Sequence, residues 1–260
     1  MTDTVANDKY TQQSIIAVKP WQTSALVSVQ VTKPDGFVFL PGQFARIGLP
    51  ESKEQSEPTI WRAYSMVTHP SEPILEFLSV TVPDGQFSPK LADLKPNDAI
   101  WIEKAPFGFL TLERFSAAKT LWLVATGTGL SAYLPMLKEP DLWRQFESVV
   151  LVHGVRQENE LTYREELDAL ATSNPALIYL PVFSQAPWLK GAQPPSRITD
   201  AYVSGELEQA AGRALDPESA RIMLCGNPAM VSEMRAMLSE KGFAAGRRGN
   251  LGTLAVENYW

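Results

Sequence analysis

Cysteine and histidine are scarce in this chain of 260 residues, which has Cys225 as its single cysteine and only two histidines. One cysteine excludes a disulfide within the chain, and it also excludes a cysteine-ligated zinc site or iron–sulfur cluster. His69 and His153 lack the spacing of paired metal ligands. We therefore expect no bound metal, and a lone reduced thiol fits a cytoplasmic location.

Positive charge and long apolar runs are scarce too. The formal net charge is −6, and the longest basic run is the pair Arg247-Arg248. A nucleic-acid-binding protein needs a basic surface to neutralise phosphates, so nucleic acid is not an expected partner. Uncharged apolar stretches are too short to span a membrane, and residues 1–14 lack the features of an export signal. The absence of a G-x-S-x-G elbow argues against a serine hydrolase.

The first part of the chain has the rhythm of a small antiparallel sheet or barrel. Up to about residue 112, apolar and polar residues alternate in short segments separated by turns. Ser88 and Pro89 also predict a short helix over residues 88–94, with Ser88 as its cap. The expected strands cover residues 23–31, 37–40, 43–48, 61–67, 75–82 and 99–104.

From residue 120 the rhythm changes to apolar runs that alternate with amphipathic segments. Such alternation predicts a parallel sheet with helices on both faces. Because the length exceeds that of most single domains, the two rhythms indicate two domains. The expected strands cover 121–125, 149–153, 177–183, 221–225 and 253–259, and the expected helices 130–138, 162–171, 199–211 and 229–241.

The segment Arg62-Ala63-Tyr64-Ser65 carries the first chemical signal. Alternation places Arg62 and Tyr64 on one face of a strand. A guanidinium can bind a pyrophosphate through paired hydrogen bonds, and a tyrosine offers a flat face to an aromatic ring. An ordinary strand with a surface arginine explains this segment equally well when it is taken alone.

Two turns in the second part carry the next signal. Thr126-Gly127-Thr128-Gly129 follows an expected strand and opens an expected helix, an arrangement that exposes backbone amides to a pyrophosphate. A second turn, Leu224-Cys225-Gly226-Asn227-Pro228, follows the fourth strand, where a nicotinamide could rest. Arg156 follows the second strand, and it and Arg197 are candidates for holding a 2′-phosphate. Each turn and each arginine also has an ordinary structural explanation.

The order and spacing of these motifs resemble the ferredoxin–NADP⁺ reductase family, and the chain is most similar to its short bacterial branch. The resemblance covers nearly the whole chain, and it includes Val80-Thr81-Val82-Pro83-Asp84-Gly85 and Phe107-Gly108-Phe109. It implies a six-stranded antiparallel FAD-binding β-barrel over residues 1–115. An NADP(H)-binding α/β domain with a parallel sheet is implied over residues 116–260.

The resemblance also implies roles for individual residues. Tyr64 and Tyr259 would enclose the flavin ring, and Trp260 would contact the adenine of a folded FAD. Positions around the reacting atoms match Ser65, Cys225, Glu257 and Tyr259, which would align the rings, with Glu257 also relaying protons. The full set implied to bind FAD is Arg62, Ala63, Tyr64, Ser65, Thr81, Gln86, Phe87, Ser88, Thr128, Tyr259 and Trp260. The set implied to bind the pyridine nucleotide is Val155, Arg156, Ser184, Gln185, Arg197, Gly226, Asn227 and Met230.

One departure from the family concerns the choice of nucleotide. After the third strand the family has Ser or Thr followed by Arg, whereas this chain has Ser184-Gln185. Gln185 carries no charge, so one contact to a 2′-phosphate is missing. Arg156 and Arg197 still match the other phosphate-binding positions, and NADP(H) is therefore the expected nucleotide.

The resemblance implies an FAD enzyme that takes hydride from NADPH and passes single electrons to ferredoxin or flavodoxin. Those partners are acidic, and the candidate docking residues are Lys90, Lys104, Arg247 and Arg248. We expect a monomer. A related reductase that serves an oxygenase or reduces free flavin or ferric complexes is one alternative. A redox-sensing, nucleotide-binding module without turnover is another.

Overall fold

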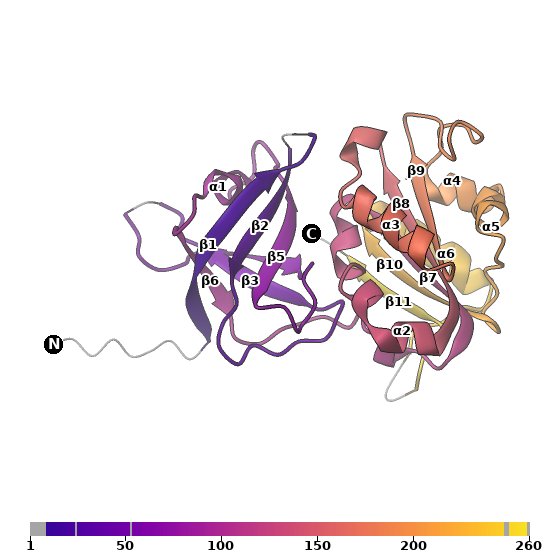
Figure 1. Ribbon diagram of the computed structural model, residues 1–260, viewed down its shortest axis with the longest axis horizontal. Helices are drawn as coiled ribbons and strands as arrows, with labels where there is room; N and C mark the ends of the chain where they lie inside the picture. Colours follow the sequence, from indigo (N-terminus) through magenta and orange to yellow (C-terminus); the bar gives the residue numbers. More distant parts are fainter. Residues whose placement is uncertain (1–8, 24, 53, 247–249, 259–260) are drawn as a thin grey trace. The chain divides into compact units, whose positions relative to one another are not determined.

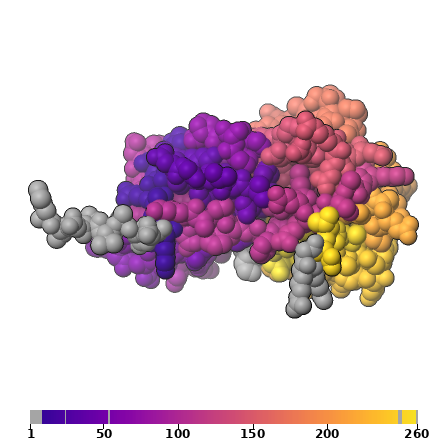
Figure 2. Space-filling model, turned by 90° about the horizontal axis from the view of Figure 1, so that it is seen from below, coloured from indigo at the N-terminus to yellow at the C-terminus, as the bar shows by residue number. Residues whose placement is uncertain are grey.

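The computed structural model describes residues 9–23, 25–52, 54–246 and 250–258. The chain divides into two compact units, Met1–Gly108 and Phe109–Trp260 (Figure 1). In the space-filling view the indigo and violet residues of the first unit form one body, and the orange and yellow residues belong to the other (Figure 2). The sequence placed the boundary after residue 115. Phe109 and Phe115 go with the second unit because Arg114 covers the ring of Phe109 and Phe115 pairs with Gly252.

The first unit is a six-stranded antiparallel barrel, as the sequence predicts. Its strands follow the order β4-β3-β6-β1-β2-β5. The two edge strands meet where Met66 bridges Phe77 and the Val67 amide donates to the Glu76 carbonyl at 2.8 Å. The strands are β1 (Tyr10–Pro20), β2 (Leu26–Thr32), β3 (Phe44–Leu49), β4 (Ile60–Ser65), β5 (Ile74–Val80) and β6 (Ala99–Glu103).

The barrel interior is filled by the alternate side chains of these strands, among them Val29, Ile47, Phe77 and Ile100. A short helix, α1 (Ser88–Asp93), adds Leu91 to the same cluster. This packing buries one face of each strand and leaves the other partly exposed, the usual pattern of an antiparallel sheet.

Three local expectations for the first unit were wrong. β1 lies before residue 23, where the first strand was expected, and it is held because it pairs with β6 on one side and β2 on the other. Residues 37–40 alternate like a strand but have no strand partner, and Phe37 and Phe39 simply point into the core. Ser88 is the first helical residue rather than the cap, because its hydroxyl accepts the Val82 amide at 2.9 Å.

The second unit is a five-stranded parallel sheet with helices on both faces, also as predicted (Figure 1). The strand order is β11-β10-β7-β8-β9. The strands are β7 (Ala118–Thr126), β8 (Phe146–Val155), β9 (Leu177–Phe183), β10 (Ala220–Gly226) and β11 (Leu254–Asn258). The α-helices are α2 (Pro140–Gln145), α3 (Arg164–Ser173), α4 (Ile198–Val203), α5 (Glu206–Ala211) and α6 (Pro228–Glu240).

The side chains of alternate residues in each central strand point to opposite faces of this sheet. Trp122 and Val124 of β7 join the core beneath α4, α5 and α6, and the intervening Leu123 is equally buried on the other face. Burial on both faces explains the continuous apolar runs of these strands. In the described residues no helix is long and apolar enough to cross a membrane.

Two helix expectations for the second unit need correction, and one helix was not expected. The helix expected over residues 130–138 is a pair of short 3₁₀ turns, η2 (Gly127–Ala132) and η3 (Met136–Lys138). The helix expected over 199–211 is broken into α4 and α5 at Gly205, whose φ of +80° suits glycine. Helix α2 was not expected. Since η2 is a short 3₁₀ segment, the turn at Thr126–Gly129 does not open an α-helix as expected.

The chain order creates one special point in this sheet. From β7 the chain runs outward through β8 to β9, and it then returns to place β10 on the other side of β7. In open parallel sheets, ligands bind at the carboxyl ends of the strands where the direction of winding reverses. This switch point lies between the ends of β7 and β10.

Candidate functional site

The first unit contains an aromatic surface built on β4. The Tyr64 ring packs against Phe77 and Phe87, with centroids 6.3 and 6.0 Å away. Its hydroxyl lies 3.1 Å from the Ser79 hydroxyl. Burial raises the pKa of Tyr64, while the Ser79 hydrogen bond and the charge of Arg62 oppose that shift. The ring is therefore a fixed, neutral platform.

Arg62 lies on the same strand and is exposed. Its Nη1 donates to the Trp61 carbonyl at 2.8 Å, and among the described residues no carboxylate pairs with it. A guanidinium without a counter-charge near an aromatic platform is suited to an anionic aromatic ligand. Ala63 between them is exposed and Ser65 is buried.

The loop that connects β5 to α1 is held by hydrogen bonds and by buried side chains. Thr81 donates its amide to the Ala25 carbonyl at 2.6 Å, and its buried hydroxyl has no partner among the described residues. Gln86 is exposed, whereas Phe87 is buried beneath Tyr64. Ser88 uses its hydroxyl to fix the loop. Phe87 and Ser88 thus shape the loop, and any ligand contact there falls to backbone groups and Gln86.

At the switch point two turns pack directly against each other. A Cβ on Gly129 would lie 2.6 Å from the Cys225 carbonyl oxygen, and one on Gly226 would lie 2.6 Å from the Thr126 carbonyl oxygen. The Asn227 amide donates to the Thr126 hydroxyl at 2.7 Å. Only glycine permits this approach, so the two turns form one rigid surface.

The second turn leads into α6 through a side-chain cap. The Asn227 Oδ1 accepts the Ala229 and Met230 amides at 2.9 and 3.3 Å. The Met230 side chain is buried in the core under α6. Met230 therefore supports the turn from below.

Cys225 and Glu257 lie side by side at this edge, because they are register partners on β10 and β11. Cys225 is fully buried. Burial raises the pKa of Glu257 to about 7, although a hydrogen bond from the Phe109 backbone opposes the shift. Its Oε1 has no partner among the described residues. Glu257 is thus able to hold or release a proton near neutral pH.

The carboxyl ends of β8 and β9 bring together the residues expected to bind a 2′-phosphate. The Ser184 amide donates to the Val155 carbonyl at 3.0 Å, and the Gln185 amide to the Arg156 carbonyl at 2.9 Å. The Ser196 amide donates to the Phe183 carbonyl at 2.9 Å. Arg156 and Arg197 consequently flank the same strand end.

Both arginines are held by acidic neighbours. Glu160 accepts the Arg156 Nε at 2.7 Å and its amide at 2.9 Å. Asp200 accepts the Arg197 Nε and Nη2 at 2.9 and 2.8 Å, and this pairing lowers the pKa of Asp200. Both guanidinium groups are exposed, so these pairs orient the arginines more than they stabilise the fold.

Sequence reasoning missed two residues of this edge. Glu160 was not singled out, although its position four residues after Arg156 is a readable signal for an ion pair. His153 was considered only as a metal ligand, and the structure places it fully buried beneath the turn at Gly127. Tyr259 and Trp260 lie outside the described residues.

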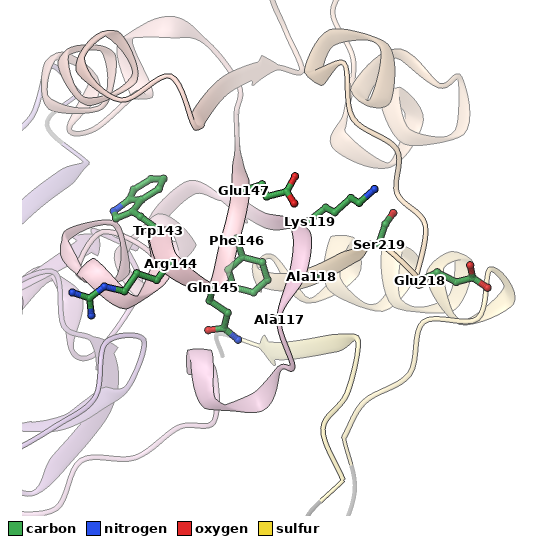
Figure 3. A pocket seen from close by; sticks show the side chains of 10 residues that line it. All are labelled: Ala117, Ala118, Lys119, Trp143, Arg144, Gln145, Phe146, Glu147, Glu218 and Ser219. Carbon is green, nitrogen blue, oxygen red and sulfur yellow. The ribbon is translucent and has the colours of Figure 1, made fainter.

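A separate depression of about 450 Å³ lies at the opposite edge of the sheet (Figure 3). Its lining includes Ala118, Phe146 and Ser219, which stand at or before the amino ends of β7, β8 and β10. Ligands of parallel sheets bind at the other edge. The switch point is therefore the candidate site of the second unit.

Comparison with known proteins agrees with this geometry. Residues 123–236 match the family model of the oxidoreductase NAD-binding domain. The chain is 34% identical to ferredoxin–NADP reductase A of Sorangium cellulosum over 95% of this chain and 89% of that protein. It is 36% identical to the flavodoxin/ferredoxin–NADP reductase of Escherichia coli over 84% of this chain and 86% of that protein.

A solved structure extends this likeness to three dimensions. The ferredoxin NADP⁺ reductase from Neisseria gonorrhoeae with bound FAD and NADP superposes with a TM-score of 0.89 at 34% identity, covering 97% of this chain and 99% of that one. Identity above 30% over almost the full length of both proteins, together with the matching two-unit fold, shows that this chain belongs to the ferredoxin–NADP reductase family.

Proposed function

We propose that the protein is a flavoprotein oxidoreductase that exchanges hydride between NADP(H) and FAD and single electrons with ferredoxin or flavodoxin. The observation that carries the proposal is that each unit presents a surface suited to one of the two cofactors. The barrel presents a fixed tyrosine beside an arginine that has no counter-charge in the described part of the chain. The parallel sheet presents two interlocked glycine turns at its switch point.

The barrel residues fit FAD. Arg62 would bind its pyrophosphate, Tyr64 would pack against the flavin ring, and Ala63 and Ser65 would line the ring between them. The loop residues Thr81, Gln86, Phe87 and Ser88 would shape the phosphate-binding turn, with Gln86 and backbone groups making the contacts to the ligand. When bound, FAD supplies a group that accepts two electrons as hydride and releases them singly.

The residues at the carboxyl edge of the second unit fit a dinucleotide. Gly226 and Asn227 would border its nicotinamide half, with Met230 supporting them, and the turn at residues 126–129 would offer backbone amides to its pyrophosphate. Thr128 is also proposed to bind the flavin. Cys225 is fully buried, and it would provide a small side wall that excludes water from the reacting atoms. Glu257 would hold a proton on its carboxyl near neutral pH. Tyr259 and Trp260 are proposed to complete the flavin site from the end of the chain.

The 2′-phosphate of NADP(H) would be bound beside β8 and β9. Arg156 and Arg197 would provide the charge, with Val155, Ser184 and Gln185 forming the surrounding backbone. Gln185 adds a neutral amide, which lies 3.4 Å from Gln157. We accordingly propose a preference for NADPH that depends on two arginines.

The protein partner is proposed to be an acidic ferredoxin or flavodoxin. Lys104 is exposed on the barrel, and Lys90 lies in the same unit with its ammonium bonded to the Glu51 carbonyl. Arg247 and Arg248 lie outside the described residues. Electrostatic docking makes the electron-transfer rate fall steeply with ionic strength. We further propose a monomer that works in the cytoplasm.

The deciding experiment starts with the visible spectrum of the purified protein. A flavin spectrum that bleaches on anaerobic NADPH titration is the expected result. The reduced protein is then mixed with ferredoxin and flavodoxin in a stopped-flow instrument, with free flavin and ferric citrate as comparison acceptors. Faster transfer to the small acceptors would assign the enzyme to the flavin or ferric reductases. A colourless protein that binds NADPH would overturn the redox proposal.

A further inference from the structure

His153 is a fully buried titratable group at the switch point that the proposed chemistry does not use. It stands on β8 opposite Ala125 of β7, directly beneath the turn that follows β7. Its Nε2 lies 3.1 Å from the Gly127 carbonyl oxygen. A carbonyl only accepts hydrogen bonds, so Nε2 carries the proton and donates.

The second ring nitrogen, Nδ1, makes no hydrogen bond within the described part of the chain that would explain a histidine at this position, which leaves the bond from Nε2. The Nδ1 atom is buried and has no hydrogen-bond partner among the described residues. An unsatisfied buried acceptor costs stability, and an apolar side chain of similar size would avoid that cost. Burial also lowers the pKa of His153 to about 4, so the ring is neutral near pH 7.

Holding the Gly127 carbonyl also sets the direction of the next amide. The described peptide bonds are all trans, and in a trans peptide the carbonyl and the following N–H point in opposite directions. Since the Gly127 oxygen faces His153, the Thr128 N–H faces away from β8. Gly127 has a φ of +52° and open space on its outer side, so the glycine alone would not hold this peptide plane.

We propose that His153 is a positioning residue for nucleotide binding, which locks the Gly127–Thr128 peptide so that the Thr128 amide faces the pyridine nucleotide. This inference rests on the proposed function, because it assumes that NADP(H) binds at the switch point. His153 itself is covered by the turn and acts through Gly127. Its loss weakens binding of the nucleotide and leaves the later steps unchanged.

Two substitutions test the hydrogen-bond donor of His153 separately from its imidazole ring. In His153→Gln the side-chain amide reaches the place of Nε2 and still donates, whereas in His153→Asn it reaches only the place of Nδ1. Titration calorimetry with NADP⁺ on the oxidised holoenzyme measures binding without turnover. We expect roughly five- to tenfold weaker binding for His153→Asn, the loss of about one hydrogen bond, and less than about twofold for His153→Gln. The Michaelis constant for NADPH should follow the same order at constant kcat.

Two control variants are needed, one for a general loss of stability and one for assigning the His153 signal in the spectrum. Leu121→Ala opens a cavity on β7 away from the carboxyl edge, so it should lower the melting temperature without changing NADP⁺ binding. His69→Asn removes the only other histidine and should change neither property. The spectra of ¹⁵N-histidine-labelled wild type and His69→Asn then identify the His153 signal, which should be that of the neutral tautomer protonated at Nε2.

The outcomes are distinguishable. Wild-type protein that fails to bind NADP⁺ would contradict the proposed function itself. Wild-type binding with equal affinities for the Asn and Gln variants would overturn the role of His153 alone, as would a tautomer protonated at Nδ1. If the Asn variant does not fold, the Gln variant alone decides. NADP⁺ binding by His153→Gln that is tenfold or more weaker than that of the wild type overturns the inference.

Discussion

The buried His153 ring should limit the acid stability of the protein. Folding lowers its pKa from 6.5 to about 4, so the folded state disfavours the proton that the unfolded state accepts. The contribution of His153 to the free energy of unfolding is therefore fully present above pH 6.5 and is lost as the pH falls towards 4, by at most about 3 kcal/mol. Urea unfolding at pH 7.5, 6 and 5 should show a smaller decline in His153→Gln. Equal declines in both proteins would refute this.

Glu257 should act on stability in the opposite direction. Its folded pKa is raised from 4.5 to about 7, so the fold favours the protonated carboxyl. Its contribution is present below pH 4.5 and is lost as the pH rises through 7, by at most about 3 kcal/mol. Glu257→Gln should therefore raise the free energy of unfolding at pH 8 and change it little at pH 5. The check is urea unfolding of the nucleotide-free protein at both values.

Arg156 should discriminate between the two nicotinamide nucleotides. Arg156→Ala removes a charge-assisted contact to the 2′-phosphate, which NADH lacks. We expect the Michaelis constant for NADPH to rise about tenfold while that for NADH changes little. Arg144→Ala is a matched control, because Arg144 is also an exposed arginine paired with a nearby carboxylate, at the opposite edge. Equal effects on the two nucleotides would contradict the assignment.

Among the elements, the two turns at the switch point tolerate the least change. Gly226 has a φ of +122°, and an added Cβ would strike the backbone of Thr126. Gly191 has a φ of +86° but open space, so Gly191→Ala isolates the cost of the backbone conformation. That control should lose about 1–2 kcal/mol. Gly226→Ala should lose roughly 2 kcal/mol more, since the turns must move apart, and NADP⁺ binding should fall with it. Chemical unfolding and calorimetry measure both effects.

Strands were predicted correctly where their own residues form a clear apolar pattern. Leu177–Phe183 was located to the residue because a short apolar run bounded by polar segments has few other structures available. β1 failed because its residues are mostly polar or half-buried, and its place depends on pairing with β2 and with β6, which lies far along the chain. The false strand at residues 37–40 failed for the converse reason, since two buried phenylalanines imitate a strand without a partner.

The candidate site was predictable where motifs lie in one segment. Arg62 and Tyr64 share a strand, and the two glycine turns follow two strands, so alternation and spacing locate them. His153 could not be found in this way, because its role arises from the register of β8 beside β7. The acidic partners of Arg197 are split between α4 and α6, so only the Asp200 contact was local enough to read.

On the scale of the whole molecule, the two units should unfold separately. Each of the two hydrophobic clusters described here lies within a single unit. A ligand stabilises the part that binds it. We expect the flavin fluorescence transition and the far-UV circular dichroism transition to differ in midpoint, and NADP⁺ to raise only the transition of the second unit. A single coincident transition under all conditions would contradict this.

The strand β1 has one residue more than its partner needs. Ile15 faces Val31 and Ala17 faces Gln30, so Ile16 is an extra, partly exposed residue between two regular stretches. A missense change at Ile16 is consequently mild, because the side chain has few neighbours to lose. Deleting the same codon would leave Ile15 opposite Val31 and Ala17 opposite Gln30 in regular one-to-one pairing, so β1 would keep its inward side chains and lose the local bend that the bulge gives it. For library design on this scaffold, codon 16 is open to exchange, and its deletion would show how far the barrel depends on that bend.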